Sequence, residues 1–306
     1  MTAASGPVLA AGDARVVLAP ATGGAIVAFT LAGRDVLRPT PPEARAAGLV
    51  RQHACYPQVP YSNRIAGATL SVGGRDHRLT RNFGDSPNSI HGLGWQRAWT
   101  VASAGAADAT LLLQHDPAID GAGDWPFAFR ARQAFSLVAT ARDASLVATL
   151  SIENTGGAAF PCGLGFHPFF PRTADTTLAF RSGGVYDNDD AQLPVAHAAV
   201  DAARRFDPPR RVDDLALDHV FSGWDGRATI AQPGAGLVAE LSAPPPASFL
   251  VVFVPRGQDF LAVEPVTHMT DAFNHAARGE SGTGTHALEP GASFSCTMRI
   301  AAAVAG

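Results

Sequence analysis

The fold class is decided by the stretch Phe129-Arg130-Ala131-Arg132-Gln133-Ala134-Phe135-Ser136-Leu137. Every second residue along it, including Ala131, Gln133, Phe135 and Leu137, is expected to face inward. A period of two is that of a β-strand with one buried face. The turn Ala141-Arg142-Asp143-Ala144 follows, and a second run continues from Leu146 to Ile152. The pattern predicts two consecutive strands between Phe129 and Glu153.

The rest of the chain shows the same short strands and little helical periodicity. Clusters of Gly, Pro, Asn and Asp separate the runs, as is typical of turns between strands. Further strands are expected at Ala14 to Leu18, Ala25 to Leu31, Ala68 to Val72, Leu111 to Gln114, Phe249 to Val254 and Ser293 to Ile300, and one short helix at Pro42 to Ala47. The sequence therefore predicts an all-β protein, a large antiparallel β-sandwich.

We expect residues 1–306 to form a single domain, since no internal repeat or linker divides them. The segment Arg181 to Asp214 shows the least alternation of apolar and polar residues and is rich in Asp, Ala, Pro and Arg. Long ordered loops in compact domains are usually functional, so we expect this segment to form an excursion that lines a site. A domain boundary there is the alternative.

Composition excludes several classes of function. The chain has 306 residues, is 46% hydrophobic, and its 23 basic and 27 acidic side chains form no long block of one sign. We therefore expect no nucleic-acid and no membrane partner. No apolar run approaches the ~18 residues of a membrane span, and the chain begins without a basic segment typical of a secretory signal. The three cysteines, Cys55, Cys162 and Cys296, form no C-x-x-C pair, and a reducing, cytoplasmic location is the simpler reading.

Four segments place polar, catalytically capable side chains among apolar or glycine neighbours. They are Phe260-Leu261-Ala262-Val263-Glu264-Pro265, Pro60-Tyr61-Ser62-Asn63-Arg64-Ile65, Asn88-Ser89-Ile90-His91-Gly92 and Gly165-Phe166-His167-Pro168-Phe169-Phe170. Burying an ionised carboxylate without a partner is costly, so Glu264 either faces a cleft or is held by donors. A Glu on the rim of the sheet, pointing to solvent, is the alternative.

In order and spacing, these segments resemble the aldose 1-epimerase (galactose mutarotase) family, from about Gly23 to the C-terminus. The matching elements are Asn63-Arg64-Ile65, His91-Gly92, His167-Pro168-Phe169-Phe170 and Glu264-Pro265, with weaker matches at Leu217-Asp218-His219-Val220-Phe221 and Leu288-Glu289-Pro290-Gly291. The resemblance implies a sandwich of the galactose mutarotase type with a sugar cleft, a small-molecule aldose as substrate, and no cofactor. It leaves a monomer or a homodimer open.

Anomer interconversion requires one base and one acid. The C1 hydroxyl must lose a proton while the ring oxygen gains one, after which the open aldehyde rotates and recloses. The resemblance gives the role of base to Glu264 and that of acid to His167. Partial burial is expected to raise the pKa of Glu264, and the pKa of His167 is expected near or above that of free imidazole.

The remaining candidates are ligand contacts with structural alternatives. His91 either contacts the ring oxygen or C1 hydroxyl or caps a turn, and Gly92 is expected to admit a close approach of a ligand to the backbone. Arg64, beside Asn63, either grips sugar hydroxyls with its planar fork or forms a structural ion pair. Asp218 is a hydroxyl acceptor or an ordinary turn residue. Trp95 and Phe273 follow these motifs closely enough to line the cleft; the alternative for both is the core.

Four other functions deserve comparison. A zinc site would draw on His91, His167, His268, His275 and His286, but these lack metal-ligand spacing, so we expect no metal. A hexose 6-phosphate mutarotase could use Arg172, Arg204, Arg205, Arg210 and Arg211, if the segment folds over the site, or these charges are solvated. A non-catalytic sugar-binding module would not need both Glu264 and His167. A lyase or hydrolase would call for a Tyr or paired carboxylates, and only Tyr56, Tyr61 and Tyr186 are present.

Overall fold

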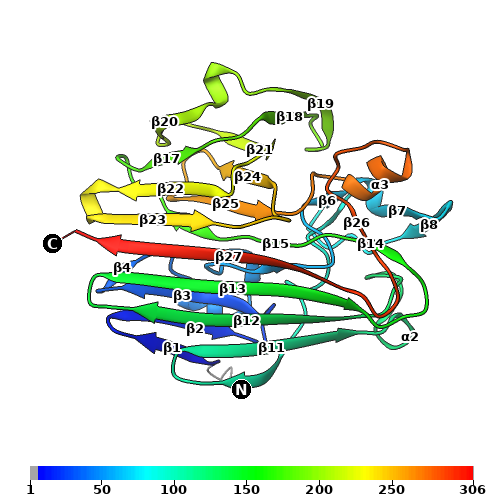
Figure 1. Ribbon diagram of the computed structural model, residues 1–306, viewed down its shortest axis with the longest axis horizontal. Helices are drawn as coiled ribbons and strands as arrows, with labels where there is room; N and C mark the ends of the chain where they lie inside the picture. The colour runs from blue at the N-terminus through cyan, green and yellow to red at the C-terminus, as the bar shows by residue number, and fades with distance from the viewer. Residues whose placement is uncertain (1–5, 306) are drawn as a thin grey trace.

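The computed structural model describes residues 6–305 and is built almost entirely from antiparallel strands (Figure 1). The extreme N-terminus, on which the expectation of no secretory signal partly rests, lies outside the described residues. The prediction of an antiparallel sandwich is confirmed. The strand ranges expected from alternation lie on observed strands, except that Ala68 belongs to the 3₁₀ turn before Thr69–Val72, and the expected helix is α1 (Pro42–Ala46), one residue shorter than predicted.

The larger layer is a nine-stranded sheet, seen across the middle of Figure 1. Its strands, in spatial order, are β10 (Thr100–Ala104), β11 (Asp108–His115), β12 (Phe129–Ala139), β13 (Asp143–Asn154), β27 (Ser293–Val304), β23 (Leu237–Ser242), β22 (Arg227–Gln232), β17 (Thr177–Phe180) and β20 (Phe206–Arg211). The hairpin of β12 and β13 runs in register from Phe129 opposite Asn154 to Ala139 opposite Ala144, and alternate residues of both strands are buried, as their alternation predicts.

The second layer is an eight-stranded sheet that carries the functional residues described below. Seven strands follow one another as β19 (Pro194–Ala199), β18 (Gly184–Asn188), β21 (Leu217–Ser222), β24 (Phe249–Val254), β25 (Phe260–Val266), β15 (Gly165–Phe166) and β5 (Pro57–Gln58), and β16 (Phe169–Pro171) also pairs with β25. β24 pairs along one side of β25, β15 and β16 pair along the other, and six of the seven residues of β25 are buried.

Smaller elements close the fold. A four-stranded sheet contains β1 (Val8–Ala11), β2 (Ala14–Ala19), β3 (Ala25–Leu31) and β4 (Arg34–Asp35), and three strand pairs join β6 (Arg64–Ile65) to β9 (Ser89–Ile90), β7 (Thr69–Val72) to β8 (Arg75–Arg78) and β14 (Phe160–Cys162) to β26 (His286–Leu288). The other helices are α2 (Pro117–Asp120), α3 (Ala272–Ala277) and the 3₁₀ turns at Val50–Gln52, Ala66–Ala68, Ala202–Arg204 and Pro233–Ala235.

The sheets bury one extended core that reaches from Leu9 to Val304. A second, smaller apolar cluster of Ala25, Val50, Tyr56, Trp95, Phe169 and Ala262 lies apart from it. All three cysteines are buried and unpaired. None of the helices between residues 6 and 305 has the length and hydrophobicity that crossing a membrane requires.

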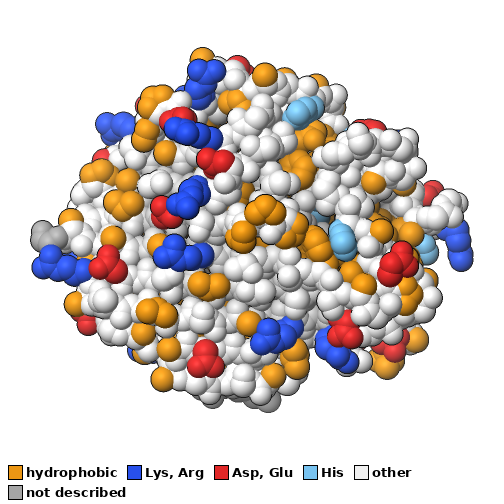
Figure 2. All heavy atoms as spheres, viewed as in Figure 1, with side chains coloured by type: hydrophobic (Ala, Val, Ile, Leu, Met, Phe, Trp, Pro, Cys, Tyr) orange, Lys and Arg blue, Asp and Glu red, His pale blue; other side chains and the backbone are white. Residues whose placement is uncertain are grey.

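Half of the segment expected to form an excursion is strand. Residues 184–188, 194–199 and 206–211 are β18, β19 and β20; β19 and β20 are edge strands of the two large sheets, and β18 lies next to β19 (upper part of Figure 1). On the face shown in Figure 2, basic and acidic side chains are interspersed.

Candidate active site

The carboxylate of Glu264 and the imidazole of His167 are brought together by strand register. Gly165 lies opposite Val266 and Phe169 lies opposite Ala262, on either side of a two-residue gap between β15 and β16. The same register continued through the gap sets His167 opposite Glu264. Since His167 stands where the strand is interrupted, its side chain is free to meet the carboxylate.

Glu264 and His167 form a buried acid–base pair. The Nε2 atom of His167 lies 3.2 Å from Oε1 of Glu264, and the two residues are only 7% and 2% exposed. Burial penalises the charged form of each group, so it raises the pKa of Glu264 well above its usual value, as expected. It lowers the pKa of His167 well below that of free imidazole, which corrects our sequence-based expectation.

His91 enters the site from a strained loop. Both Asn63 and His91 have left-handed backbone conformations, with φ of 57° and 60°. The backbone amide of Asn63 donates to Nδ1 of His91 over 3.0 Å, and the His91 amide donates to the Asn63 carbonyl over 2.8 Å. Nδ1 therefore accepts, and the ring proton of neutral His91 stands on Nε2.

The expected role of Gly92 is corrected by its surroundings. A side chain at Gly92 would meet the carbonyl oxygen of Val59 at 2.2 Å, and its φ is 68°. Glycine is needed for the close approach of the protein's own backbone rather than that of a ligand. The tight loop leaves His91 8% exposed, and burial together with Arg64 lowers the pKa of His91 to about 3.

Arg64 and Asp218 stand together across the site. Nη2 of Arg64 lies 3.9 Å from Oδ2 of Asp218, and Nη1 donates to Oδ1 of Asn63 over 2.9 Å. Burial raises the pKa of Asp218, and Arg64 opposes that rise. Asp218 comes from β21, beside β24, whose Val251 lies opposite Glu264. Strands β21 and β25 of the eight-stranded sheet and the separate β6–β9 pair thus meet at one site.

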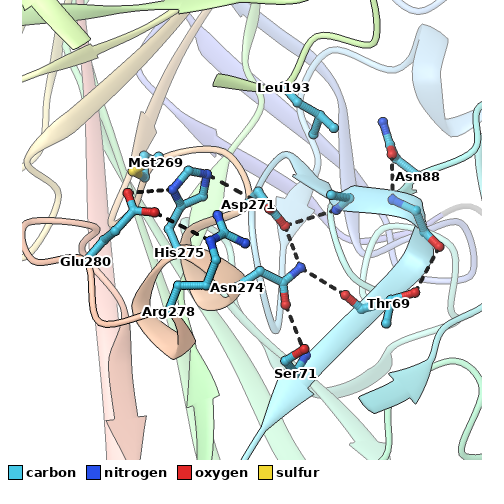
Figure 3. A network of polar contacts seen from close by, with 12 residues as sticks. Thr69, Ser71, Asn88, Leu193, Met269, Asp271, Asn274, His275, Arg278 and Glu280 are labelled. Carbon is cyan, nitrogen blue, oxygen red and sulfur yellow. Dashed lines mark hydrogen bonds and ion pairs between the residues drawn. The ribbon is translucent and has the colours of Figure 1, made fainter. Parts of the chain in front are cut away.

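A polar network anchors the strand that carries Arg64 (Figure 3). The Asp271 amide donates to the Arg64 carbonyl over 2.9 Å, and Oδ1 of Asp271 accepts from the Ala66 amide and from Nδ2 of Asn274, over 3.0 and 2.7 Å. Asn274 in turn bonds to the backbone of Thr69 and Ser71. The segment after Glu264 therefore holds β6 and β7 in place from behind.

Glu264, His167, His91, Arg64 and Asp218 line one cleft of about 260 Å³. The lining combines polar and apolar side chains. The polar ones are Arg51, Asn63, Arg64, His91, His167, Asp218 and Glu264, and the apolar ones are Tyr56, Phe83, Ile90, Phe169, Val251, Phe253 and Phe260. A mixed wall of charged and aromatic groups suits a small ligand with hydroxyls on its rim and C–H groups on its faces.

Two expected cleft residues lie elsewhere. Phe273 is 3% exposed and packs its ring among Tyr61, Trp125 and His268, so the structure does not place it in the cleft. Trp95 is also absent from the lining. It donates from Nε1 to the carbonyls of Ile90 and Gly92, both over 3.1 Å, and so supports the His91 loop from behind.

The arginine-rich segment does not cover the site. No residue between 181 and 214 lines the cleft, nor does Arg172. Arg204 pairs with Asp187 and Asp201, and Arg210 and Arg211 donate to backbone carbonyls. The proposed phosphate contacts from these arginines are therefore wrong.

The five histidines of the zinc hypothesis are scattered. His91 and His167 have ring centres 5.3 Å apart, whereas His275 bonds to Glu280 and His286 stacks on Phe294. His268 accepts from the Ser62 amide. Within residues 6–305, no three His, Cys, Asp or Glu side chains are arranged to hold a metal ion.

Comparison with known proteins places this site in a family. A match to the aldose 1-epimerase family covers residues 8–301. The chain belongs to the aldose 1-epimerase family. The protein YphB of Escherichia coli K12, which is uncharacterised, is 28% identical over 286 residues, covering 91% of this chain and 92% of YphB.

Solved structures agree with this assignment. The crystal structure of a candidate aldose 1-epimerase from Escherichia coli K12 superposes with a TM-score of 0.86 and 26% identity, covering 98% of this chain and 99% of that one. A galactose mutarotase-like protein from Clostridium acetobutylicum has the same fold, with a TM-score of 0.85 at 17% identity and coverages of 97% and 95%.

Several residues of this cleft were missed from the sequence. Gln58 donates from Nε2 to Glu264 and reaches His91, and Tyr56 lies under His167 with ring centres 4.5 Å apart. The signal that could have found them is proximity to the Asn63-Arg64 element. Arg51 and Phe83 gave no signal, since single residues outside the strands have no pattern, whereas Phe260 begins the run that leads to Glu264 and could have been included for that reason.

Proposed function

We propose that the protein is an aldose 1-epimerase that interconverts the α and β anomers of an aldose, with Glu264 as base and His167 as acid. The observation that carries this proposal is the 3.2 Å contact between a buried carboxylate and a buried imidazole at the bottom of a cleft. Ring opening needs such a pair, one group to take the proton of the C1 hydroxyl and one to give a proton to the ring oxygen.

The pair can work with a single proton. In one form Glu264 is a carboxylate and His167 an imidazolium; in the other Glu264 is a carboxylic acid and His167 is neutral. During ring opening Glu264 gains the hydroxyl proton and His167 loses its own to the ring oxygen, so the pair passes from the first form to the second. Reclosing reverses both transfers. Because neither form has a net charge, the transfer does not require a net charge to be buried.

The other cleft residues fit the binding of a pyranose. Neutral His91 presents a hydrogen-bond donor at Nε2, suited to the ring oxygen or a hydroxyl on C1. We assign Arg64, Asn63 and Asp218 to the remaining hydroxyls, as two donors and an acceptor held by one another. The aromatic rings of Tyr56, Phe83 and Phe169 provide flat apolar surface for the C–H faces of a sugar.

A phosphorylated aldose is a second candidate substrate, favoured by one observation. Arg51 lines the cleft with its guanidinium carbon 4.5 Å from the centre of the Phe83 ring, and no ion pair ties it to an acidic side chain within residues 6–305. An anionic substituent of the sugar would supply that partner. A non-catalytic sugar-binding module gives no reason to bury Glu264 against His167.

We further propose that residues 1–306 form one domain, because the family match spans residues 8–301 and one core joins both ends. A cytoplasmic location, a metal-free reaction and a monomer or homodimer stay predictions. Their tests are separate from the test of the reaction.

Polarimetry of freshly dissolved α-aldoses tests the proposed function. A panel of hexoses, pentoses and hexose 6-phosphates is followed with and without the protein. We expect the protein to accelerate the decay of optical rotation for at least one aldose. An Arg51→Gln variant that loses the phosphorylated sugars but keeps the neutral ones would establish the anionic substrate, and sugar binding with no acceleration for any member would leave only a binding module.

A further inference from the structure

A buried glutamine joins the base to the second histidine of the site. Gln58 ends strand β5, is 0% exposed, and its single amide nitrogen lies 2.8 Å from Oε2 of Glu264 and 3.0 Å from Nδ1 of His91. That nitrogen carries two hydrogens and can serve both acceptors at once. No other side chain donates to either of these two atoms within residues 6–305.

The orientation of the Gln58 amide follows from its neighbours. Nδ1 of His91 already accepts a hydrogen bond from the Asn63 amide, so it carries no proton and has nothing to offer an amide oxygen. The carboxylate of Glu264 likewise only accepts when ionised. The nitrogen of Gln58 must therefore face both groups, which leaves its oxygen on the other side.

The opposite side is shaped to receive that oxygen. A Cβ atom at Gly165 would lie 2.4 Å from Oε1 of Gln58, so a residue with any side chain there would push the amide out of place. Gly165 pairs with Gln58 in the sheet. Oε1 itself is buried and has no hydrogen-bond partner in the described chain. An unsatisfied buried oxygen costs free energy, so the hydrogen bonds of the Gln58 nitrogen to Glu264 and His91 must hold the amide in this orientation.

We propose that Gln58 is a positioning residue that keeps the Glu264 carboxylate ionisable and, together with the Asn63 amide, holds His91 as the tautomer with its proton on Nε2. The inference rests on the proposed function for its catalytic meaning. Oε2 of Glu264 is occupied by Gln58, so Oε1 is the oxygen left for His167 and the substrate. The donor also favours the charged carboxylate and so opposes the effect of burial on the pKa of Glu264.

Replacing Gln58 by Met removes both hydrogen bonds at nearly constant volume. Loss of one donor to a carboxylate should move the acidic limb of the pH–rate profile up by about 1 to 2 pH units. Without Gln58, the tautomer of His91 is held only by the Asn63 amide, and we expect ~10-fold or greater loss of kcat with little change in KM.

Gln133→Met provides the matched control. Gln133 is another buried glutamine, 2% exposed, and it donates to the Gly24 carbonyl away from the cleft. Both variants should lose thermal stability, but only Gln58→Met should move the acidic limb. An unmoved limb in Gln58→Met, with a rate equal to that of Gln133→Met, would overturn the proposal.

Nitrogen-15 NMR of the ring nitrogens of His91 separates this inference from the reaction itself. In the wild-type protein without sugar, we expect Nδ1 to show the shift of an unprotonated nitrogen and Nε2 that of a protonated one. In Gln58→Met both shifts should move toward their average. A wild-type spectrum with the proton on Nδ1, or shifts that stay unchanged in Gln58→Met, would refute the inference even if the protein is an active epimerase, and shifts that move in Gln58→Met would support it even if no aldose reacts.

Discussion

Replacing His91 by Asn tests the reading that His91 acts as a neutral donor. The variant removes the Nε2–H that we assign to the substrate, and the shorter amide does not reach as far. A hydrogen bond to a group that gains charge contributes about 1.5 to 3 kcal/mol, so kcat/KM should fall about 10- to 150-fold. We expect both affinity and rate to suffer, each less than the rate of a His167 variant.

The structure adds a condition on pH to this prediction. Burial and the nearby Arg64 lower the pKa of His91 to about 3, so its charge does not change over the pH range in which the protein would be assayed. The ratio of wild-type to His91→Asn activity should therefore be constant from about pH 5 to pH 8. Anomer exchange measured by NMR gives this ratio directly.

The control and the refuting outcome are equally specific. His286→Asn removes a histidine that stacks on Phe294 outside the cleft, and it should leave the rate within about twofold of wild type. If instead the ratio for His91→Asn changes through pH 6 to 7 with the midpoint of an ordinary imidazole, His91 titrates during catalysis. The neutral-donor reading would then be wrong.

Three further predictions follow from the same contacts. His167→Asn should lower kcat much more than it weakens sugar binding, as measured by optical rotation; a His91→Asn variant that loses more kcat than His167→Asn would invert the two roles. Exhaustive chelation should leave anomerisation unchanged, and recovery of an inactivated sample by one added metal would restore the zinc hypothesis. Burial lowers the pKa of His53 to about 4, so between pH 4 and 6.5 the unfolded state holds a proton that the folded state lacks, and stability falls as the pH drops through 6.5. Denaturant unfolding should therefore show His53→Leu gaining at most about 2 kcal/mol relative to wild type on going from pH 8 to pH 5, and an equal difference at both pH values would contradict this.

Much of the fold was predictable because alternation directly reflects which face of a strand is buried. The run from Phe129 to Ile152 gave β12 and β13 with their buried faces. Alternation fails where both faces, or neither, are covered. The edge strands β19 and β20 contain exposed Ala and Pro residues respectively, so the segment between residues 181 and 214 shows little alternation and was expected to be an excursion.

The site was predictable where short motifs carry the chemistry, and less so where tertiary packing decides. Glu264, His167, His91, Arg64 and Asp218 all line one cleft. Phe273 was expected there because it follows Glu264 closely, but Asp271 bonds back to the Arg64 strand and turns the aromatic ring into the core. Proximity to the Asn63-Arg64 element was the one signal for Gln58, because nothing in Tyr56-Pro57-Gln58 itself shows that β5 pairs beside β15.

The most direct test of the central claim is the rate of anomer exchange in Glu264→Gln. The amide keeps the shape of the side chain and removes its basicity, while thermal unfolding and sugar binding check that the fold and the cleft survive. We predict a loss of at least ~100-fold in exchange rate with the fold intact. An exchange rate near that of wild type would contradict it, because the proton of the C1 hydroxyl would then leave by a route that does not involve Glu264.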